Sequence, residues 1–163
     1  MNMANKIHKV FVYGTLKKGE PNHHWLTDIK NGAANFVSRA TTNDKYPLVI
    51  ATRYNIPFLL DKPGEGYNVS GEIYEVDDKM LSNLDVLEDH PNLYVRELAD
   101  VSSDEDEMFI FSRHSCWIYL LKTFPPALLS ALFLENYTNK PPTHYTHQDP
   151  VEQLTSKMIW TIS

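Results

Sequence analysis

Short apolar runs separated by turn residues are the feature that most limits the folds open to this chain. β-branched and aromatic residues dominate these runs, which is typical of strands. We expect turns at residues 43–45 and 53–55, where polar residues interrupt the pattern. The segments we expect to form strands are residues 8–13, 34–42, 46–50, 56–61, 69–76, 94–102, 108–112 and 114–121. This pattern favours one α+β domain over a regular array of alternating strands and helices.

The clearest helix signal covers residues 77–89. Asp77 is a good N-cap residue, an acidic residue follows it in the first turn, and Pro91 stops the run. We also expect a short helix at residues 21–29 and another at residues 125–137. The chain therefore predicts many strands with two or three helices.

One acidic residue continues the apolar face of the predicted helix at 77–89. The face itself is formed by Met80, Leu81, Leu84 and Leu87. The next position on it is Glu88, so the pattern turns a carboxyl group inward. Burial and the negative end of the helix dipole would both raise its pKa, which suits general acid/base chemistry. If the helix ended early, Glu88 would instead face water, and the residues alone leave both outcomes open.

The segment "VFVYGTLKKGE" has the glycine spacing of a phosphate-binding loop, but it lacks that loop's chemistry. A phosphate loop needs Lys and then Ser or Thr after the second glycine, whereas this chain has Glu20 and Pro21. What remains is a strand that ends at Gly14. A turn there could gather consecutive N–H groups around a carboxylate or an oxyanion. A plain strand-to-turn glycine is the alternative.

Composition excludes several classes of protein and site. The net charge of −6 argues against a nucleic-acid partner. The single cysteine, Cys116, rules out an internal disulfide and a cysteine-based zinc site, and we interpret it as a core thiol. It also fits a reducing compartment, so we expect a cytoplasmic protein. The apolar stretch 116–134 approaches the length of a membrane span, but Lys122 and two adjacent prolines interrupt it, which argues against a membrane partner.

The chain is about the length of one domain. We place that domain at residues 7–137. Residues 138–163 are polar and proline-rich at their start, and we expect them to form a divergent, loosely ordered C-terminal tail.

Four motifs recur in a known order and spacing. Y-G-T-L, N-I-P, G-E-I-Y-E-V and L-D-x-L-E-x-x-P-x-x-Y-x-R lie between Lys9 and Glu97. In these motifs the chain resembles the γ-glutamylcyclotransferase-like (AIG2-like) family. The resemblance implies a small mixed β-barrel with flanking helices and a site that needs no metal, nucleotide or other cofactor.

The resemblance also implies a set of site residues. The backbone of Tyr13, Gly14, Thr15 and Leu16 would bind the γ-glutamyl group of the substrate. Glu88 would be the single acid/base. The resemblance therefore favours the inward-facing position of Glu88 over the exposed one.

Other residues receive weaker assignments from the same resemblance. Tyr94 corresponds to a family tyrosine that either contacts substrate or supports the core. Arg96 is better interpreted as an ion-pair partner than as a catalytic group. The resemblance weakens after Val101, where Tyr119 and Tyr137 are faint counterparts of a further pocket tyrosine.

The function implied is an intramolecular aminolysis. The "YGTLKKGE" and "LEDHP" variants resemble the γ-glutamylamine type of the family. That type converts γ-glutamyl amines such as γ-glutamyl-ε-lysine to 5-oxoproline and releases the amine. A non-catalytic γ-glutamyl or carboxylate-binding module on the same fold is the alternative. We expect a monomer whose partner is a small γ-glutamyl molecule.

Overall fold

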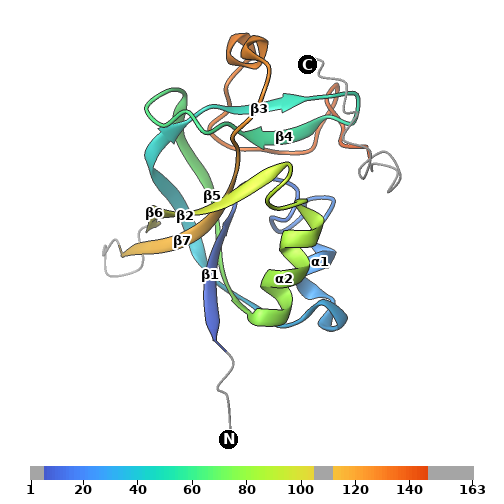
Figure 1. Ribbon diagram of the computed structural model, residues 1–163, viewed down its shortest axis with the longest axis vertical. Coiled ribbons are helices and arrows are strands. Elements are labelled where there is room, and N and C mark those ends of the chain that lie inside the picture. The colour runs from blue at the N-terminus through green and yellow to red at the C-terminus, as the bar shows by residue number, and fades with distance from the viewer. Residues whose placement is uncertain (1–5, 105–111, 147–163) are drawn as a thin grey trace, which may run out of the picture.

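Five strands close into a barrel in the computed structural model, which describes residues 6–104 and 112–146 (Figure 1). Around the barrel the order is β1 (Ile7–Val12), β5 (Tyr67–Asp77), β2 (Ala34–Tyr46), β6 (Tyr94–Ser103) and β7 (Arg113–Leu121). Neighbouring strands are antiparallel except β1 and β7, which run parallel and meet at Val10 and Trp117. The expected mixed barrel is therefore confirmed. The strand expected at residues 108–112 lies largely outside the described residues.

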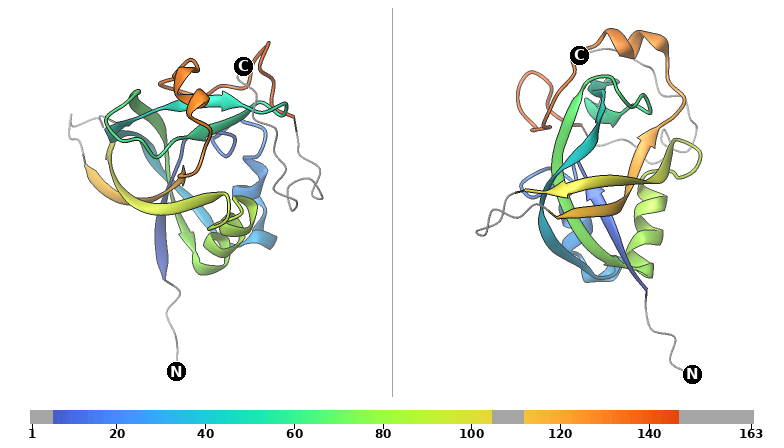
Figure 2. Two further views of the ribbon diagram at one scale, coloured as in Figure 1. Left: turned by 45° about the horizontal axis from the view of Figure 1, so that its top comes forward. Right: turned by 90° about the vertical axis from the view of Figure 1, so that its left-hand side faces the viewer.

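Two helices and a hairpin surround this barrel. Helices α1 (His24–Thr27) and α2 (Asp78–Leu87) lie on one side of it, and the hairpin of β3 (Leu48–Ala51) and β4 (Ile56–Leu59) crosses one end (Figures 1 and 2). Short 3-10 helices occur at Ile29–Asn31 and Pro126–Ser130. The flanking helices expected from the sequence are thus present.

The alternation of side chains along the strands builds two cores. One face of β1 carries Phe11, which packs with Ile73 and Ile118 in a cluster that fills the barrel. The other face carries Val10 and Val12, whose cluster also contains residues of α2 and of the hairpin. The second cluster therefore lies between the barrel and the elements that cover it, and it forms the floor of the site described below.

The turn expected at residues 43–45 is wrong, because β2 continues through it to Tyr46. The pairing of β2 with β5 shifts register between Thr41 and Lys45, so the polar residues sit in a bulge. The Asn68 side chain donates to the carbonyl oxygens of Thr42 and Asn43 at 3.0 and 2.9 Å. These bonds satisfy backbone groups that the irregular pairing leaves open.

The helix expected at residues 125–137 is also wrong beyond its first turn. Only Pro126–Ser130 is helical, as a 3-10 segment. The following residues bond to other elements: the Leu134 N–H donates to the Leu48 carbonyl at 2.9 Å, and the Ser70 N–H donates to the Glu135 carbonyl at 2.8 Å. Tertiary pairing therefore outweighs local helix propensity here. Within the described part of the chain, no helix has the length and apolar character needed to cross a membrane.

Candidate active site

Glu88 is the first residue after α2, and its side chain turns into a pocket beside the barrel. The helix begins as expected, with the Asp77 side chain accepting a hydrogen bond from the Met80 N–H at 2.9 Å. Its apolar face is buried through Leu84. It ends at Leu87, slightly earlier than the sequence predicts. Glu88 nevertheless faces inward, as the apolar stripe indicated.

The closure of the helix explains this position. The Glu88 N–H still donates to the Leu84 carbonyl at 2.9 Å, although its own backbone angles, φ −87° and ψ 1°, have left the helical range. The next residue, Asp89, has φ 50°. The N–H groups of residues 89 and 90 then donate to the carbonyls of Val86 and Asp85 at 3.1 and 2.8 Å, the two bonds of a Schellman motif. This closure fixes Glu88 at the helix end.

The loop after β1 forms the facing part of the pocket. It turns tightly, with the Lys17 N–H donating to the Gly14 carbonyl at 3.2 Å. Among the described residues, the N–H groups of Gly14, Thr15 and Leu16 donate no hydrogen bond. All three residues line the pocket. Three neighbouring backbone donors are therefore left for a ligand.

Gly14 is needed for a close approach. A Cβ atom there would lie 2.9 Å from Cγ of Pro57 on β4, closer than real Cβ atoms pack. Positive φ is found at other glycines of the described residues, not at Gly14. The glycine therefore brings the loop against the hairpin.

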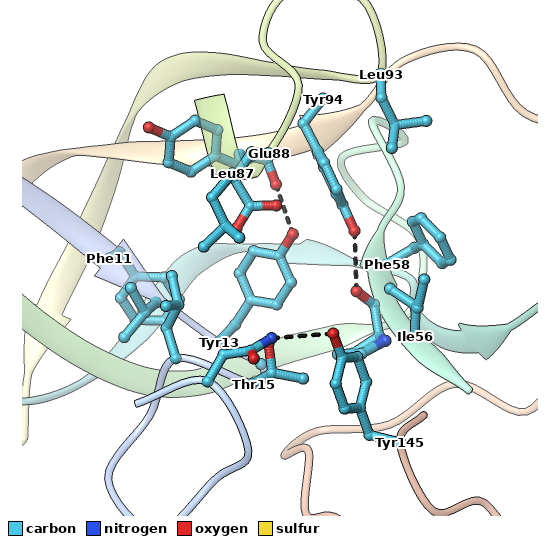
Figure 3. Close-up of a pocket in the computed structure, with 16 residues that line it drawn as sticks. Phe11, Tyr13, Thr15, Ile56, Phe58, Leu87, Glu88, Leu93, Tyr94 and Tyr145 are labelled. Carbon is cyan, nitrogen blue, oxygen red and sulfur yellow. Dashed lines mark hydrogen bonds between the residues drawn. The ribbon is translucent and has the colours of Figure 1, made fainter. Parts of the chain in front are cut away.

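All six residues predicted for the site line one pocket: Tyr13, Gly14, Thr15, Leu16, Glu88 and Tyr94. In Figure 3 the Glu88 side chain lies across this pocket from Thr15 and Tyr145. The remaining lining residues come from β1, the loop before α1, the hairpin, the end of α2, the loop before β6, β7 and the C-terminal part of the described chain; they are Phe11, Val12, Asn22, Ile56, Pro57, Phe58, Leu87, Leu93, Tyr119 and Tyr145.

The carboxyl group of Glu88 is held in a poorly hydrated place. Burial raises the pKa of Glu88 to about 7, because loss of water disfavours the charged form. Within the described part of the chain, no group donates a hydrogen bond to this carboxylate. Burial raises the pKa of Tyr13 as well, and the charge of Glu88 adds to that effect. Near neutral pH, Glu88 can therefore both take up and release a proton.

The tyrosines around Glu88 are held by backbone carbonyls. The Tyr13 hydroxyl donates a hydrogen bond to the Tyr119 carbonyl at 2.7 Å, and the Tyr94 hydroxyl donates one to the Pro57 carbonyl at 3.2 Å. The Tyr94 ring also stacks on Phe58, with 5.7 Å between the ring centroids. Tyr94 thus both supports the core and forms part of the pocket wall.

Arg96 has the ion-pair role that the sequence suggested. Its Nε donates to Oδ1 of Asp85 at 2.8 Å, and its guanidinium lies over the Trp117 ring at 4.3 Å. The Tyr119 hydroxyl donates to the same carboxylate at 2.8 Å. Burial alone would raise the pKa of Asp85, but the hydrogen bonds from Arg96 and Tyr119 hold it below its ordinary value. This cluster braces the end of α2 from behind the pocket.

Three further predictions can be compared with the structure. Tyr119 lines the pocket, whereas Tyr137 is fully buried in the barrel cluster. Cys116 is a buried core thiol, and burial raises its pKa to about 11. Three or more metal-ligating His, Cys, Asp or Glu side chains do not gather anywhere in residues 6–104 and 112–146.

Two polar residues of the pocket, Asn22 and Tyr145, were not predicted from the sequence. Tyr145 lies in the segment expected to be a loose tail, and its hydroxyl accepts a hydrogen bond from Nδ2 of Asn22 at 3.1 Å. Asn22 also donates to Oγ1 of Thr15 at 3.0 Å. No local pattern marks either residue, because their contact spans 123 positions of the chain.

Comparison with known proteins gives consistent matches. The family model described as "Gamma-glutamyl cyclotransferase, AIG2-like" matches residues 10–139. A Drosophila melanogaster protein named putative gamma-glutamylcyclotransferase CG2811 is 50% identical over 90% of this chain and 92% of its own length. The gamma-glutamylaminecyclotransferase of Homo sapiens is 42% identical over 88% of this chain and 97% of its own. The crystal structure of an AIG2-like protein from Mus musculus superposes with a TM-score of 0.81 at 41% identity, covering 88% of this chain and 97% of that one.

Proposed function

Because the chain belongs to the gamma-glutamyl cyclotransferase, AIG2-like family, we propose that its pocket cyclises the glutamyl group of γ-glutamyl amines with Glu88 as the acid/base. The protein is a γ-glutamylcyclotransferase of the γ-glutamylamine type, the activity for which its matching vertebrate relatives are named. The products in this proposal are 5-oxoproline and the free amine.

The reaction needs little more than positioning and proton transfer. The α-amine of the glutamyl group attacks its own γ-carbonyl carbon, a C–N bond forms to close a five-membered ring, and the C–N bond to the departing amine breaks. The attacking nitrogen gives up two protons in all, and the departing nitrogen gains two if it leaves as an ammonium ion. One carboxylate that alternates between its two states can carry both protons in turn. Holding the flexible chain in the folded-back geometry supplies much of the rate.

The observation that carries this proposal is the position of Glu88 across one pocket from unpaired backbone donors. The N–H groups of Gly14, Thr15 and Leu16 can hold the α-carboxylate of the substrate or the oxygen that gains charge during attack. In this arrangement Glu88 lies close to the attacking and departing nitrogen atoms of the substrate. A pure binding module would have no use for a buried acid beside an anion site, which is why the catalytic proposal is preferred.

The pKa of Glu88 suits both accepting a proton from the attacking amine and returning one to the departing amine. With a pKa of about 7, a neutral solution holds comparable amounts of the carboxylate that accepts a proton and the acid that returns it. A carboxyl group at its ordinary pKa would be a weaker base by more than two orders of magnitude.

The test is release of 5-oxoproline from γ-glutamyl-ε-lysine by the unchanged protein and by Glu88→Gln. We expect the substitution to lower kcat by about 10²–10⁴-fold, the usual contribution of a general acid/base. Glu65→Gln, on the exposed turn before β5, is the matched control and should keep full activity. A Glu88→Gln protein that turns over at the parent rate would refute the assigned role.

The leaving amine is the second part of the proposal. We expect γ-glutamyl-ε-lysine to be a better substrate than a γ-glutamyl α-amino acid or glutathione, and measuring kcat/KM for the three side by side tests this. Preference for glutathione would move the protein to a different substrate class while leaving the chemistry of Glu88 intact.

A further inference from the structure

The end of the described chain runs beside the pocket and contributes one residue, Tyr145, to its lining. Residues 138–146, called the C-terminal strap from here on, are bound at several points. At its start the Asn139 N–H donates to Oε2 of Glu20 at 3.0 Å. At its end the Thr146 N–H donates to the Tyr54 carbonyl at 2.8 Å, and Nδ2 of Asn55 donates to the carbonyl of residue 144 at 2.9 Å. The strap therefore joins the loop after β1 to the β3–β4 hairpin.

Tyr145 carries the strap into the pocket. Its N–H donates to Oδ1 of Asn139 at 2.7 Å, which bends the strap back on itself. Its hydroxyl accepts from Asn22, the same amide group that donates to Thr15. The strap is thus tied to the loop that we propose holds the glutamyl group. Burial raises the pKa of the Tyr145 phenol; the hydrogen bond from Asn22 opposes this, and the charge of Glu88 across the pocket adds to it.

The wall that Tyr145 forms has an apolar character. Ile56 and Phe58 of β4 line the same pocket, and Figure 3 shows both on the side of Tyr145. An aromatic ring on the same side of the pocket as these apolar side chains suits the methylene stem of an alkyl amine, whose charged end can reach water.

The two halves of a γ-glutamyl amine place different demands on the pocket. The glutamyl half is common to all such substrates, and in the proposed function it meets the loop amides and Glu88. The amine half extends beyond the reacting carbonyl and must contact the lining that these groups leave over. That lining includes Tyr145 of the strap and the residues of β4, together with Leu87, Leu93 and Tyr94. The match to the family model ends at residue 139, six residues before Tyr145.

We propose that Tyr145 is a specificity-determining residue, whose ring packs against the alkyl chain of the leaving amine and so favours a long amine such as the ε-linked lysine. Its bond to Asn22 holds the ring in place. This inference rests on the proposed function and deepens it by assigning the amine subsite.

The test compares two substrates that share the glutamyl half, γ-glutamyl-ε-lysine and γ-glutamyl methylamide. In Tyr145→Ala we expect kcat/KM for the lysine compound to fall at least tenfold, with a change of less than about threefold for the methylamide, because hydrophobic contacts of a few methylene groups discriminate by about this much. Tyr145→Phe keeps the ring and should retain the parent's preference within about threefold. Tyr67→Ala, at a half-exposed tyrosine of β5 outside the pocket, is the matched control and should not change the preference.

The outcomes separate the two proposals. Equal losses on both substrates in Tyr145→Ala, or no loss on either, would overturn the role of Tyr145 while leaving the proposed function standing. A melting curve for each variant tells a folding defect from a change in selectivity, and if Tyr145→Ala does not fold, a loss of the preference in Tyr145→Phe also overturns the role of the ring. If the unchanged protein releases 5-oxoproline from neither substrate, the proposed function itself fails, and the inference fails with it.

Discussion

Replacing Glu88 by glutamine should make the protein more stable at alkaline pH, while lowering the proposed activity by about 10²–10⁴-fold. The folded state holds this carboxyl group where its charged form is disfavoured, and the unfolded chain does not. As the pH rises from 4.5 to 7, Glu88 becomes ionised in the unfolded chain but stays largely protonated in the folded protein. The raised pKa therefore contributes stability at low pH that is lost as the pH passes through about 7.

The magnitude follows from the size of this pKa change. Burial moves the pKa of Glu88 from 4.5 to about 7, and each pKa unit corresponds to about 1.4 kcal/mol. The ionised carboxylate thus costs the folded protein up to about 3 kcal/mol above pH 7, and water in the open pocket lowers this to about 2–3 kcal/mol. Glutamine has nearly the same shape and never ionises. The variant should match the parent near pH 4.5 and exceed its free energy of unfolding by about 2–3 kcal/mol at pH 8.

Urea unfolding of parent and variant, followed by tryptophan fluorescence at several pH values, measures this difference directly. Glu65→Gln removes an exposed carboxyl group and should show no such pH-dependent gain. A difference between Glu88→Gln and the parent that stays constant from pH 4.5 to 8 would contradict the burial of the carboxylate. So would a variant that is less stable at pH 8. Either result would remove the basis for the acid/base assignment.

Three further predictions follow from the same contacts. The kcat/KM of the parent should rise with pH through an apparent pKa of about 7, because the proposed first step needs ionised Glu88 in the free enzyme; a pH–rate profile flat across this range would argue against it. Asp85→Asn should lower the free energy of unfolding by about 2 kcal/mol, because it leaves the half-buried Arg96 guanidinium without its charged partner; denaturant melts check this. Gly14→Ala should cost about 1–3 kcal/mol and raise KM, since its Cβ would collide with the Pro57 ring; unchanged steady-state kinetics would show that the loop can shift without loss.

The inward position of Glu88 was one of two outcomes that the residues left open, and the family resemblance favoured it, although the helix ends sooner than its pattern indicates. The apolar stripe through Leu84 set the direction of the next turn. The Glu88 N–H still makes the last helical hydrogen bond, to the Leu84 carbonyl, so its Cβ follows the stripe even though its own ψ has left the helical range. The apolar pattern and the observed geometry agree here because the side chain of Glu88 keeps the direction that a continued helix would give it.

Long-range pairing produced the features that the sequence did not reveal. The residues expected to continue a helix after Pro125 instead make backbone hydrogen bonds to Leu48 and Ser70. No local sequence pattern predicts these long-range bonds. Tyr145 reaches the pocket for the same reason: polar and proline-rich surroundings predict a loose tail, while side chains on distant elements bind this part of it. Intrinsic propensity describes the conformation of an isolated segment, whereas both of these segments make hydrogen bonds to distant parts of the chain.

Tyr119 connects the two sides of the site, which are the end of α2 that carries Glu88 and the loop after β1. The Tyr119 hydroxyl donates a hydrogen bond to Asp85, three residues before Glu88 on α2, and the Tyr119 carbonyl accepts one from the hydroxyl of Tyr13, at the start of the loop proposed to hold the glutamyl group. Side chain and backbone of a single position on β7 thus connect the end of the helix to the loop across the pocket. Because strands of a closed barrel move little against each other, this connection can hold a destabilised carboxyl group at a fixed place relative to the loop amides. A ring closure that relies on positioning needs that fixed geometry more than it needs a strong base.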